Sequence, residues 1–324
     1  MKALVEGVWQ SPVTDIDAYQ AARAAQTPDL FRGWVRAAGG RGFTAEPGRY
    51  HLYVSHACPF AHRTTLMRAL KGLEQAISVS VLHPRWAGPQ GWQFTADPAF
   101  PEVTEDHVNG DAALWQTYVR AQPRFTGKVV VPVLWDKAQK TIVSTESADI
   151  LRMLDCAFDA FATNKTSYYP EELRAEIDEL AAIIRPRING GVYAVGFATS
   201  QDGYDRAVAA LFAALDDLEA RLAHGQPFLL GERMTEADLL LFPTLVRFDA
   251  VYHGALRCNL RMLRNYPGLS ALARRVHAIP GVAETVKLDH VRRHYYDDLG
   301  LIDPTILPAG PLVDFAAEAA SAAA

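Results

Sequence analysis

Residues 55–63 read Ser-His-Ala-Cys-Pro-Phe-Ala-His-Arg and mark the point where a β-rich run gives way to a helical one. The run before them, Tyr50–Val54, alternates and is rich in strand-forming residues, which predicts a strand. The run Cys58–Leu70 predicts a helix with Pro59 in its first turn, where the missing N–H of proline costs nothing. The sequence therefore places Cys58 at the start of a helix that follows directly on a strand.

The elements on either side of this stretch predict a mixed α/β domain. A second strand is expected at Ile77–Leu82, and a strand pair at Val129–Trp135 and Thr141–Val143. A helix follows over Thr145–Leu154, with Ser144 or Thr145 as its N-cap. The order of strand, helix, strand, insertion, hairpin and helix differs from a repeated βα pattern.

These elements define the expected boundaries of the first half. We expect an N-terminal extension over residues 1–48 and a mixed α/β domain over residues 49–157. The segment 83–127 is too long for a plain connection between two strands, and long insertions of this kind are often functional. A linker is expected over residues 158–169.

Helical periodicity dominates the second half of the chain. Apolar residues recur at i, i+3 and i+4 over Glu171–Ile184 and Tyr204–Leu222. Residues 235–238 fit a capping box with Asp in the Glu position, before an apolar run, and Pro267–Ile279 predicts a further short helix. We therefore expect an all-helical domain over residues 170–324, with an Ala-rich C-terminal tail from Phe315.

Composition and charge exclude several classes of function. The 324 residues carry a formal net charge of -5 and no dense basic block, which argues against a nucleic-acid partner. No apolar stretch reaches transmembrane length and the N-terminus has no apolar signal region, so we expect no membrane association. The three cysteines are too widely spaced for a disulfide framework or a zinc cluster. They indicate a protein of a reducing, cytoplasmic compartment. His62, His253 and His294 have no carboxylate or cysteine partners at metal-ligand spacing, so we expect no metal.

Cys58 is the candidate nucleophile. A thiol at a helix N-terminus faces unsatisfied amide N–H groups and the positive end of the helix dipole, which stabilise the thiolate. His62 and Arg63 lie one turn further on and would add positive potential. Ala61 stands where a second cysteine of a Cys-x-x-Cys pair would be, so an external thiol such as glutathione must resolve any disulfide. The alternative is an inert, buried cysteine.

Two further segments suit a peptide-like ligand. Pro132 interrupts a β-rich run, and a cis peptide bond there would leave the backbone of Val131 free to pair with a peptide. The alternative is an ordinary edge-strand proline. At residues 144–147, Ser-Thr-Glu-Ser, the amides would bind a carboxylate while Glu146 binds an ammonium group. The alternative here is a helix cap with no ligand.

Taken together, these segments resemble the glutathione transferases, and more narrowly their xi class, the glutathionyl-hydroquinone reductases. The resemblance covers residues 31–296, in family order. It is carried by Phe31–Trp34, Ala57–Arg63, Gly91–Phe94, Val131–Lys137, Thr141–Ser147, Asn189–Tyr193, Phe228–Leu239, Arg247–Gly254 and Arg293–Tyr296. It implies a thioredoxin-like N-terminal domain followed by an all-helical C-terminal domain.

The resemblance also implies roles for individual residues. Cys58 would be the nucleophile. Glutathione would be held by Trp92, Lys128, Val131, Glu146 and Ser147, with Lys128 in the place of the usual arginine. The aromatic part of the substrate would contact the phenolic hydroxyls of Tyr193, Tyr252 and Tyr295. Tyr296 is an alternative to Tyr295, because the spacing permits either.

The activity implied is reduction of a glutathionyl-hydroquinone by glutathione, in a homodimer. An omega-like thioltransferase or dehydroascorbate reductase is the alternative within enzymes. A non-catalytic scaffold with this fold is the alternative of another class. Phe60 and Thr145 replace the usual Trp and Asn, and Arg85–Gly91 fits the family pattern poorly, which bears on substrate preference.

Overall fold

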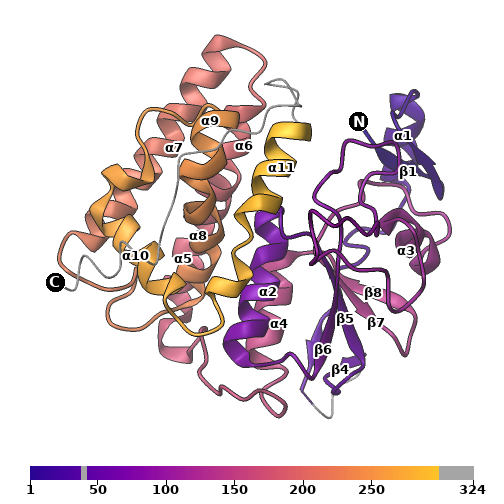
Figure 1. Ribbon diagram of the computed structural model, residues 1–324, viewed down its shortest axis with the longest axis horizontal. Helices are drawn as coiled ribbons and strands as arrows, with labels where there is room; N and C mark the ends of the chain where they lie inside the picture. Colours follow the sequence, from indigo (N-terminus) through magenta and orange to yellow (C-terminus); the bar gives the residue numbers. More distant parts are fainter. Residues whose placement is uncertain (38–41, 299–324) are drawn as a thin grey trace. The chain divides into compact units, whose positions relative to one another are not determined.

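The computed structural model describes residues 1–37 and 42–298. The chain divides into two compact units, Met1–Lys165 and Thr166–Ala324, called here the first and the second unit. The first unit contains a mixed sheet with helices, and the second is built of helices (Figure 1). The predicted combination of an α/β part and an all-helical part is therefore confirmed. The Ala-rich tail from Phe315 lies outside the described residues.

A four-stranded sheet organises the first unit, in the order β6-β5-β7-β8. Strand β5 (Tyr50–Val54) pairs in parallel with β6 (Ile77–Val81) and antiparallel with β7 (Val133–Asp136), which in turn pairs antiparallel with β8 (Thr141–Ser144). All five side chains of β5 are buried, as expected for a central strand covered on both faces.

The prediction that the third strand begins at Val129 is wrong, because β7 begins at Val133. The Val130 carbonyl accepts a hydrogen bond from the Tyr118 hydroxyl at 2.9 Å, and the Val130 N–H donates to the same oxygen at 3.3 Å. The backbone of this residue is therefore bound to a side chain and not to a neighbouring strand. Pro132, which has no N–H to offer a ladder, follows two residues later.

Three helices accompany the sheet. Helices α2 (Pro59–Lys71) and α4 (Ser147–Cys156) pack together on one face of the sheet, and α3 (Leu114–Ala121) lies on the other (Figure 1). The prediction of Ser144 or Thr145 as N-cap of α4 is wrong, because the cap is Glu146, whose carboxylate accepts from the Ala148 N–H at 3.2 Å. The Thr145 N–H instead donates to the Phe31 carbonyl at 3.1 Å, outside the helix.

The N-terminal segment adds elements that the sequence did not predict. They are β1 (Ala3–Val5), β2 (Val8–Gln10), α1 (Ile16–Ala24), β3 (Val35–Arg36) and β4 (Phe43–Thr44). Leu4 pairs with Gly127, and Arg32 pairs with Ser144 at the end of β8. Residues 31–33 thus lie along the outer edge of β8 and supply partners for its backbone.

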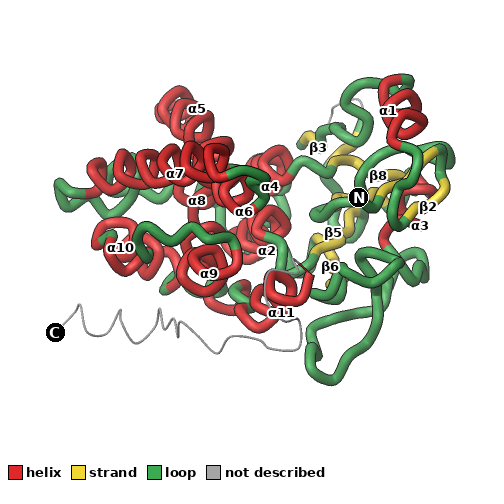
Figure 2. Tube along the Cα trace, turned by 90° about the horizontal axis from the view of Figure 1, so that it is seen from above, coloured by secondary structure: helices red, strands yellow, loops and turns green. Residues whose placement is uncertain are grey.

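The second unit contains helices joined by loops and turns (Figure 2). Its α-helices are α5 (Arg174–Ile183), α6 (Gly191–Gly196), α7 (Gln201–Leu222), α8 (Glu236–Arg247), α9 (His253–Ala255), α10 (Pro267–His277) and α11 (Leu288–Asp298). Short 3₁₀ turns occupy η1 (Glu171–Leu173), η4 (Leu263–Asn265) and η5 (Ala283–Thr285), and π-helical turns occupy η2 (Ile184–Asn189) and η3 (Phe248–Tyr252).

Helix α8 forms the centre of the second unit, since every side chain from Glu236 to Arg247 is buried. The predicted capping box is confirmed. The Asp238 carboxylate accepts from the Thr235 N–H at 2.8 Å and from the Leu229 N–H at 2.9 Å. Burial raises the pKa of Asp238 to about 6 in spite of these donors.

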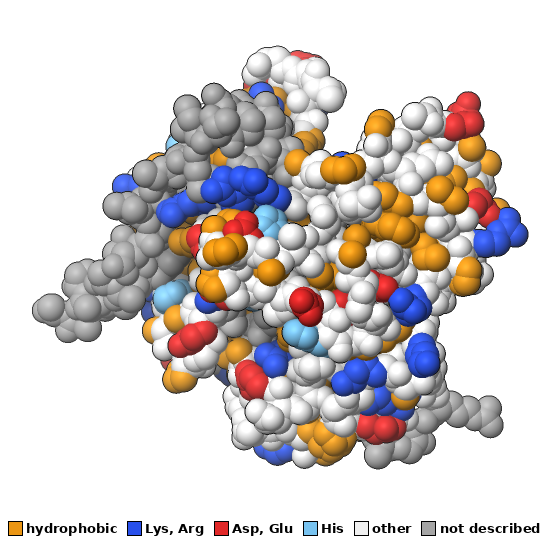
Figure 3. Space-filling view, turned by 45° about the vertical axis from the view of Figure 1, so that its right-hand side comes forward, with side chains coloured by type: hydrophobic (Ala, Val, Ile, Leu, Met, Phe, Trp, Pro, Cys, Tyr) orange, Lys and Arg blue, Asp and Glu red, His pale blue; other side chains and the backbone are white. Residues whose placement is uncertain are grey.

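The surface is mixed in character. On the face drawn in Figure 3, charged side chains of both signs lie among apolar ones. None of the helices within residues 1–37 and 42–298 combines the length and the apolar character that a membrane crossing requires.

Candidate active site

Cys58 is the N-cap residue of α2 and has extended backbone, with φ -78° and ψ 123°. Its thiol is partly exposed, and Sγ lies 3.6 Å from the Val131 carbonyl oxygen. The strand before it and the helix after it are those that the sequence predicts. A sulfur in this place faces the first turn of a 13-residue helix, where free N–H groups favour a negative charge.

The segment before β7 provides backbone groups for a ligand. The peptide bond between Val131 and Pro132 is cis. No described residue accepts a hydrogen bond from the Val131 N–H. Lys128, three residues earlier, is exposed and has no ion-pair partner in the described part of the chain. A peptide N–H and a nearby free cation suit a ligand that carries both a peptide bond and a carboxylate.

Glu146 and Ser147 lie at the start of α4. Ser147 is buried, and its hydroxyl accepts a hydrogen bond from the Arg63 guanidinium at 3.0 Å. Arg63 is itself 3% exposed and lies over the Phe60 ring, with its Cζ 5.0 Å from the ring centroid. Arg63 therefore connects the helix that begins at Cys58 with the helix that begins at Ser147.

Trp92 lies in the long insertion, where it is 7% exposed. Its carbonyl accepts from the Leu114 N–H at 2.9 Å, at the start of α3. The loop just before it is attached to the N-terminal hairpin. The Lys2 ammonium donates to the carbonyls of Trp86, Ala87 and Gly88, and the Trp9 indole donates to that of Pro89.

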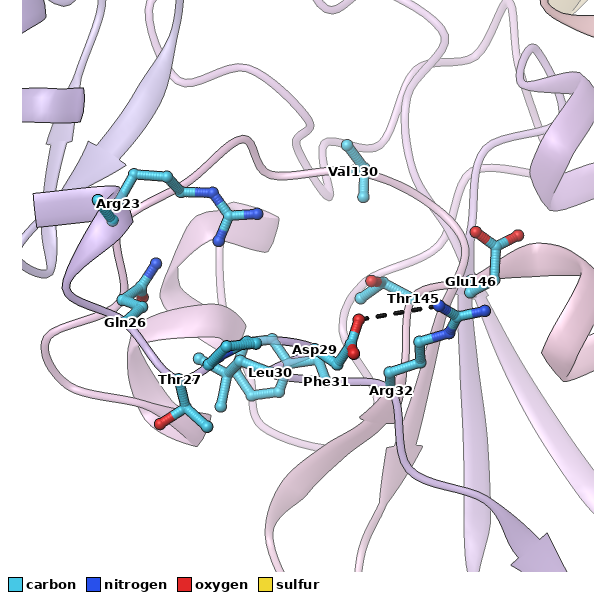
Figure 4. A pocket seen from close by; sticks show the side chains of 12 residues that line it. Arg23, Gln26, Thr27, Asp29, Leu30, Phe31, Arg32, Val130, Thr145 and Glu146 are labelled. Atoms are coloured by element: carbon cyan, nitrogen blue, oxygen red, sulfur yellow. Dashed lines mark ion pairs between the residues drawn. The ribbon is translucent and has the colours of Figure 1, made fainter. Parts of the chain in front are cut away.

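A hollow of about 620 Å³ opens beside Glu146 in the first unit. One side is formed by residues 23–32 of the N-terminal segment, and the other by Val130, Thr145 and Glu146 (Figure 4). Phe31 is buried at its floor, whereas Arg23 is exposed and extends into it. The hollow is therefore adjacent to two residues, Val131 and Ser147, that the family resemblance assigns to glutathione.

Three tyrosines form a cluster in the second unit. The Tyr295 hydroxyl hydrogen-bonds that of Tyr193, and it lies 3.4 Å from that of Tyr252. The ring centroids of Tyr252 and Tyr295 are 5.3 Å apart in an edge-to-face arrangement. Tyr252 and Tyr295 are buried, and Tyr193 is half-buried. The structure thus brings together the three tyrosines that the resemblance assigns to the aromatic substrate.

Burial and the two neighbouring phenols hold the pKa of Tyr295 well above its ordinary value. The hydroxyl therefore stays protonated and can donate at any pH near neutrality. Tyr296 is also buried, but its hydroxyl lies against Gly254, where an added Cβ would come within 2.7 Å. Of the two tyrosines that the sequence left open, Tyr295 joins the cluster.

The other cysteines lie in different surroundings. Cys156 is exposed at the end of α4, far along the helix from its N-terminus. Cys258 is fully buried, and desolvation raises its pKa to about 12, so its thiol stays neutral. Neither stands at a helix start.

Sequence reasoning missed two residues that shape the site. Tyr118 fixes Val130 through its hydroxyl, and it was missed because no helix was predicted within the insertion. The role of Arg63 in holding Ser147 depends on the packing of α2 against α4, for which a single sequence gives no signal.

Family models match both parts of the chain. The glutathione S-transferase N-terminal domain matches residues 57–157, and the glutathione S-transferase C-terminal domain matches residues 201–275. The first match begins one residue before Cys58 and extends to the residue after α4.

Individual relatives match over nearly the whole chain. Glutathionyl-hydroquinone reductase PcpF of Sphingobium chlorophenolicum is 45% identical over 96% of this chain and 96% of its own length. Glutathionyl-hydroquinone reductase YqjG of Escherichia coli (strain K12) is 45% identical over 97% of this chain and 96% of its own. Glutathione S-transferase omega-like 2 of Schizosaccharomyces pombe is 41% identical over 83% of this chain and 88% of its own length.

Solved structures match in the same way. A xi class glutathione transferase from Natrialba magadii superposes with a TM-score of 0.90 at 45% identity, covering 98% of this chain and 95% of its own. The glutathione-bound structure of YqjG from Escherichia coli K-12 gives a TM-score of 0.84 at 44% identity, covering 97% of each chain.

Proposed function

Because the chain belongs to the glutathione transferase family, and to its xi class, we propose that it reduces glutathionyl-hydroquinones to hydroquinones with glutathione, through Cys58. The observation that carries the proposal is the position of Cys58. It is a partly exposed thiol at the first turn of α2, beside the Val131 carbonyl. No second cysteine accompanies it in the helix, so glutathione must complete the cycle.

In the first step the Cys58 thiolate attacks the glutathionyl sulfur of the substrate. The bond between that sulfur and the aromatic carbon breaks, and its electron pair goes to the ring carbon, which takes up a proton. The products are the hydroquinone and a mixed disulfide of Cys58 with glutathione. We assign proton delivery to the tyrosine cluster, because Tyr295 is held protonated among two further hydroxyls.

In the second step the thiolate of a free glutathione attacks the glutathione sulfur of the mixed disulfide. Cys58 leaves as a thiolate, which the N-terminus of α2 favours, and oxidised glutathione is released. The sum of the two steps converts one glutathionyl-hydroquinone and one glutathione into one hydroquinone and one oxidised glutathione.

We propose that glutathione is held by the residues that the resemblance selects in the first unit. The Val131 N–H would pair with its peptide backbone, Lys128 with a carboxylate, and Glu146 with its ammonium group. The buried Ser147 hydroxyl, oriented by Arg63, and Trp92 would complete the site.

The first experiment compares the native protein with Cys58→Ser. Each is incubated with a glutathionyl-hydroquinone and excess glutathione, and release of the hydroquinone is followed by chromatography. We expect rapid release by the native protein and none above background by the variant. Full activity in Cys58→Ser would eliminate this mechanism.

A thioltransferase acting on ordinary mixed disulfides is the second candidate, favoured by the omega-like relative at 41% identity. This chemistry needs Cys58 but no proton donor for an aromatic ring. Turnover of a small mixed disulfide without hydroquinone release would select it. Conjugation of glutathione to electrophiles is less well supported, because a cysteine occupies the place where that chemistry uses a Tyr or Ser hydroxyl.

We also propose a cytoplasmic location, where reducing conditions keep Cys58 as a thiol, and catalysis without a resident metal. The family resemblance suggests a homodimer. Light scattering on the purified protein, with a single chain of 35.6 kDa as reference, tests the dimer directly.

A further inference from the structure

The tyrosine cluster has an aromatic neighbour that the proposed reaction does not yet use. Phe197 is the C-cap residue of α6, and its ring centroid lies 6.0 Å from that of Tyr193 with an interplanar angle of 16°. The Tyr193 ring in turn lies 6.4 Å from that of Tyr295, at 28°. Phe197 therefore adds a third ring, one without a hydroxyl, to the stack that contains the two hydrogen-bonded phenols.

The Phe197 side chain is 58% exposed. Exposure alone does not mark a site, because single apolar side chains on a protein surface are common. Leu260 is exposed to the same extent, and it stands beside Arg261, whose guanidinium is bound to Asp216 in α7. What distinguishes Phe197 is its contact with a tyrosine of the cluster to which we assign proton delivery.

A fixed turn presents this exposed ring. The Phe197 N–H donates to the Tyr193 carbonyl at 2.9 Å. Gly196, just before it, packs so closely on Leu256 that an added Cβ would lie 2.4 Å from that side chain. The Gly196 carbonyl accepts from the Arg257 guanidinium at 3.3 Å. The backbone on both sides of the ring is thus held, and the ring keeps its place beside Tyr193.

The chemistry next to the phenols is apolar at this point. The nearest cation given by the backbone contacts, Arg257, is engaged with the Gly196 carbonyl and lies over the Tyr204 ring at 5.7 Å. A hydroquinone directs its hydroxyls to polar partners, whereas alkyl groups and fused rings on its other carbons gain by leaving water. A hydrocarbon ring beside the phenols suits such a group, through offset stacking or simple apolar contact.

We propose that Phe197 determines specificity by contacting an apolar substituent on the ring of the aromatic substrate, so that alkylated or fused-ring hydroquinones are favoured over unsubstituted ones. The inference rests on the proposed function and extends it, because it names the class of hydroquinone. Phe197 takes no part in proton or thiol transfer.

The test measures binding and needs no turnover. The glutathionyl conjugates of tert-butylhydroquinone and of unsubstituted hydroquinone are titrated calorimetrically, without free glutathione, into protein that carries Cys58→Ser. We expect the tert-butyl conjugate to bind roughly three- to tenfold more tightly, as for burial of one or two methyl groups. Adding Phe197→Ala should bring this ratio of Kd values close to one, by weakening the tert-butyl conjugate.

Two further variants separate the contact from general packing. Leu260→Ala is the matched control, since it removes an equally exposed apolar side chain of the same unit, and it should leave the ratio unchanged. Phe197→Leu keeps an apolar group in place and should retain at least half of the preference. A displaced Tyr193 would weaken both conjugates alike and would not change their ratio.

A native-like ratio in Phe197→Ala would overturn the proposal, as would the same loss in Leu260→Ala. The competing occupant of this ring is a second copy of the chain, and a lower mass of Phe197→Ala than of the native protein in light scattering would assign the ring to that contact instead. Failure of the proposed function is seen separately. Native protein that releases no hydroquinone, while the binding ratio depends on Phe197, keeps the contact and loses the reductase assignment.

Discussion

Tyr295 contacts both other phenols of its cluster through one hydroxyl. If this hydroxyl delivers the proton to the aromatic ring, Tyr295→Phe should slow hydroquinone release by at least about tenfold, because a positioned general acid contributes about 10²–10⁴ to a rate. Transfer from a small mixed disulfide requires no ring protonation and should proceed at the native rate. Single-turnover measurements with both substrates give the two rates.

Tyr296→Phe is the matched control, because Tyr296 is the next residue and similarly buried but lies against Gly254. It should retain at least half of the native rate. The raised pKa of Tyr295 also predicts that the release step does not fall through loss of this proton up to about pH 10, its ordinary range. Equal losses in the two variants would make the cluster a packing feature.

His51 is a second residue whose environment predicts a measurable property. It is fully buried in β5, with Nδ1 2.7 Å from the Ser78 hydroxyl. Burial lowers the pKa of His51 to about 4. The negative charge of Asp106 opposes this shift, whereas three nearby basic side chains add to it: Lys137, His107 and Arg68. The folded state therefore favours the neutral imidazole.

A lowered pKa in the folded state means that the unfolded chain takes up the proton first as the pH falls. The contribution of His51 to stability is therefore fully present above about pH 6.5 and is lost as the pH falls toward 4. With about 1.4 kcal/mol per pKa unit, the loss is about 3 kcal/mol. Denaturant unfolding between pH 4 and 7 should show this loss in the free energy of unfolding of the native protein but not in that of His51→Gln. Parallel pH curves for the two proteins would refute this assignment.

At the scale of elements, the loop before Trp92 depends on the first ten residues. The Lys2 ammonium donates to three successive carbonyls at 2.6–2.8 Å and lies 4.5 Å from the Trp86 ring centroid. The Trp9 ring stacks on the Trp115 ring. A Cβ atom added at Gly91 would lie 3.0 Å from the Trp9 ring, so the loop passes close to this ring. This is the region that departs from the family pattern, and here it is held by the β1–β2 hairpin.

Lys2→Met should therefore loosen this loop without unfolding the unit. We expect faster hydrogen exchange at residues 86–91, and a KM for glutathione that rises roughly threefold with kcat nearly unchanged, since charge-assisted bonds at a partly exposed site contribute about 1 kcal/mol. Lys140→Met is the control, because Lys140 is exposed in the turn between β7 and β8 and has no partner among described residues. A fall in kcat with an unchanged KM in Lys2→Met would contradict the idea that this loop supports glutathione binding by Trp92.

For the whole molecule, the sequence predicts best where structure is local. The strand before Cys58 has the predicted bounds, and the helix after it ends one residue beyond them, because both follow from periodicity and from Pro59. Val129 and Val130 have strand-forming side chains and are still not in a strand. The backbone of Val130 is bound to the Tyr118 hydroxyl, and a contact with an unpredicted helix is invisible in a local pattern.

The site shows the same division. Cys58 was identified from a local argument about a helix start, whereas the tyrosine cluster was selected only by family resemblance. Periodicity cannot distinguish a packed tyrosine from one that meets two other hydroxyls. Tyr252 ends a π-helical turn, η3, and such turns alter which side chains share a face. The hollow at Arg23 was missed because it joins segments about 100 residues apart in the sequence.

The role of the N-terminal segment in the fold gives the last prediction. Phe31 is 9% exposed, and its ring centroid lies 5.8 Å from that of Tyr118 and 5.3 Å from that of Phe125. Its carbonyl accepts from the N–H of Thr145, two residues before the start of α4. Phe31→Ala should therefore lower the free energy of unfolding by about 3–4 kcal/mol, as for other buried aromatic side chains.

Leu260→Ala provides the comparison, since Leu260 is 58% exposed and its truncation should change the stability by no more than about 0.5 kcal/mol. Denaturant unfolding of both variants gives the difference. If residues 1–48 were an appendage to a complete domain, Phe31→Ala would match Leu260→Ala, and deletion of residues 1–33 would leave a folded, glutathione-binding protein. If they are part of the first unit, the deletion removes the partners of Gly127 and Ser144 and exposes Phe125, so the truncated chain should aggregate or unfold.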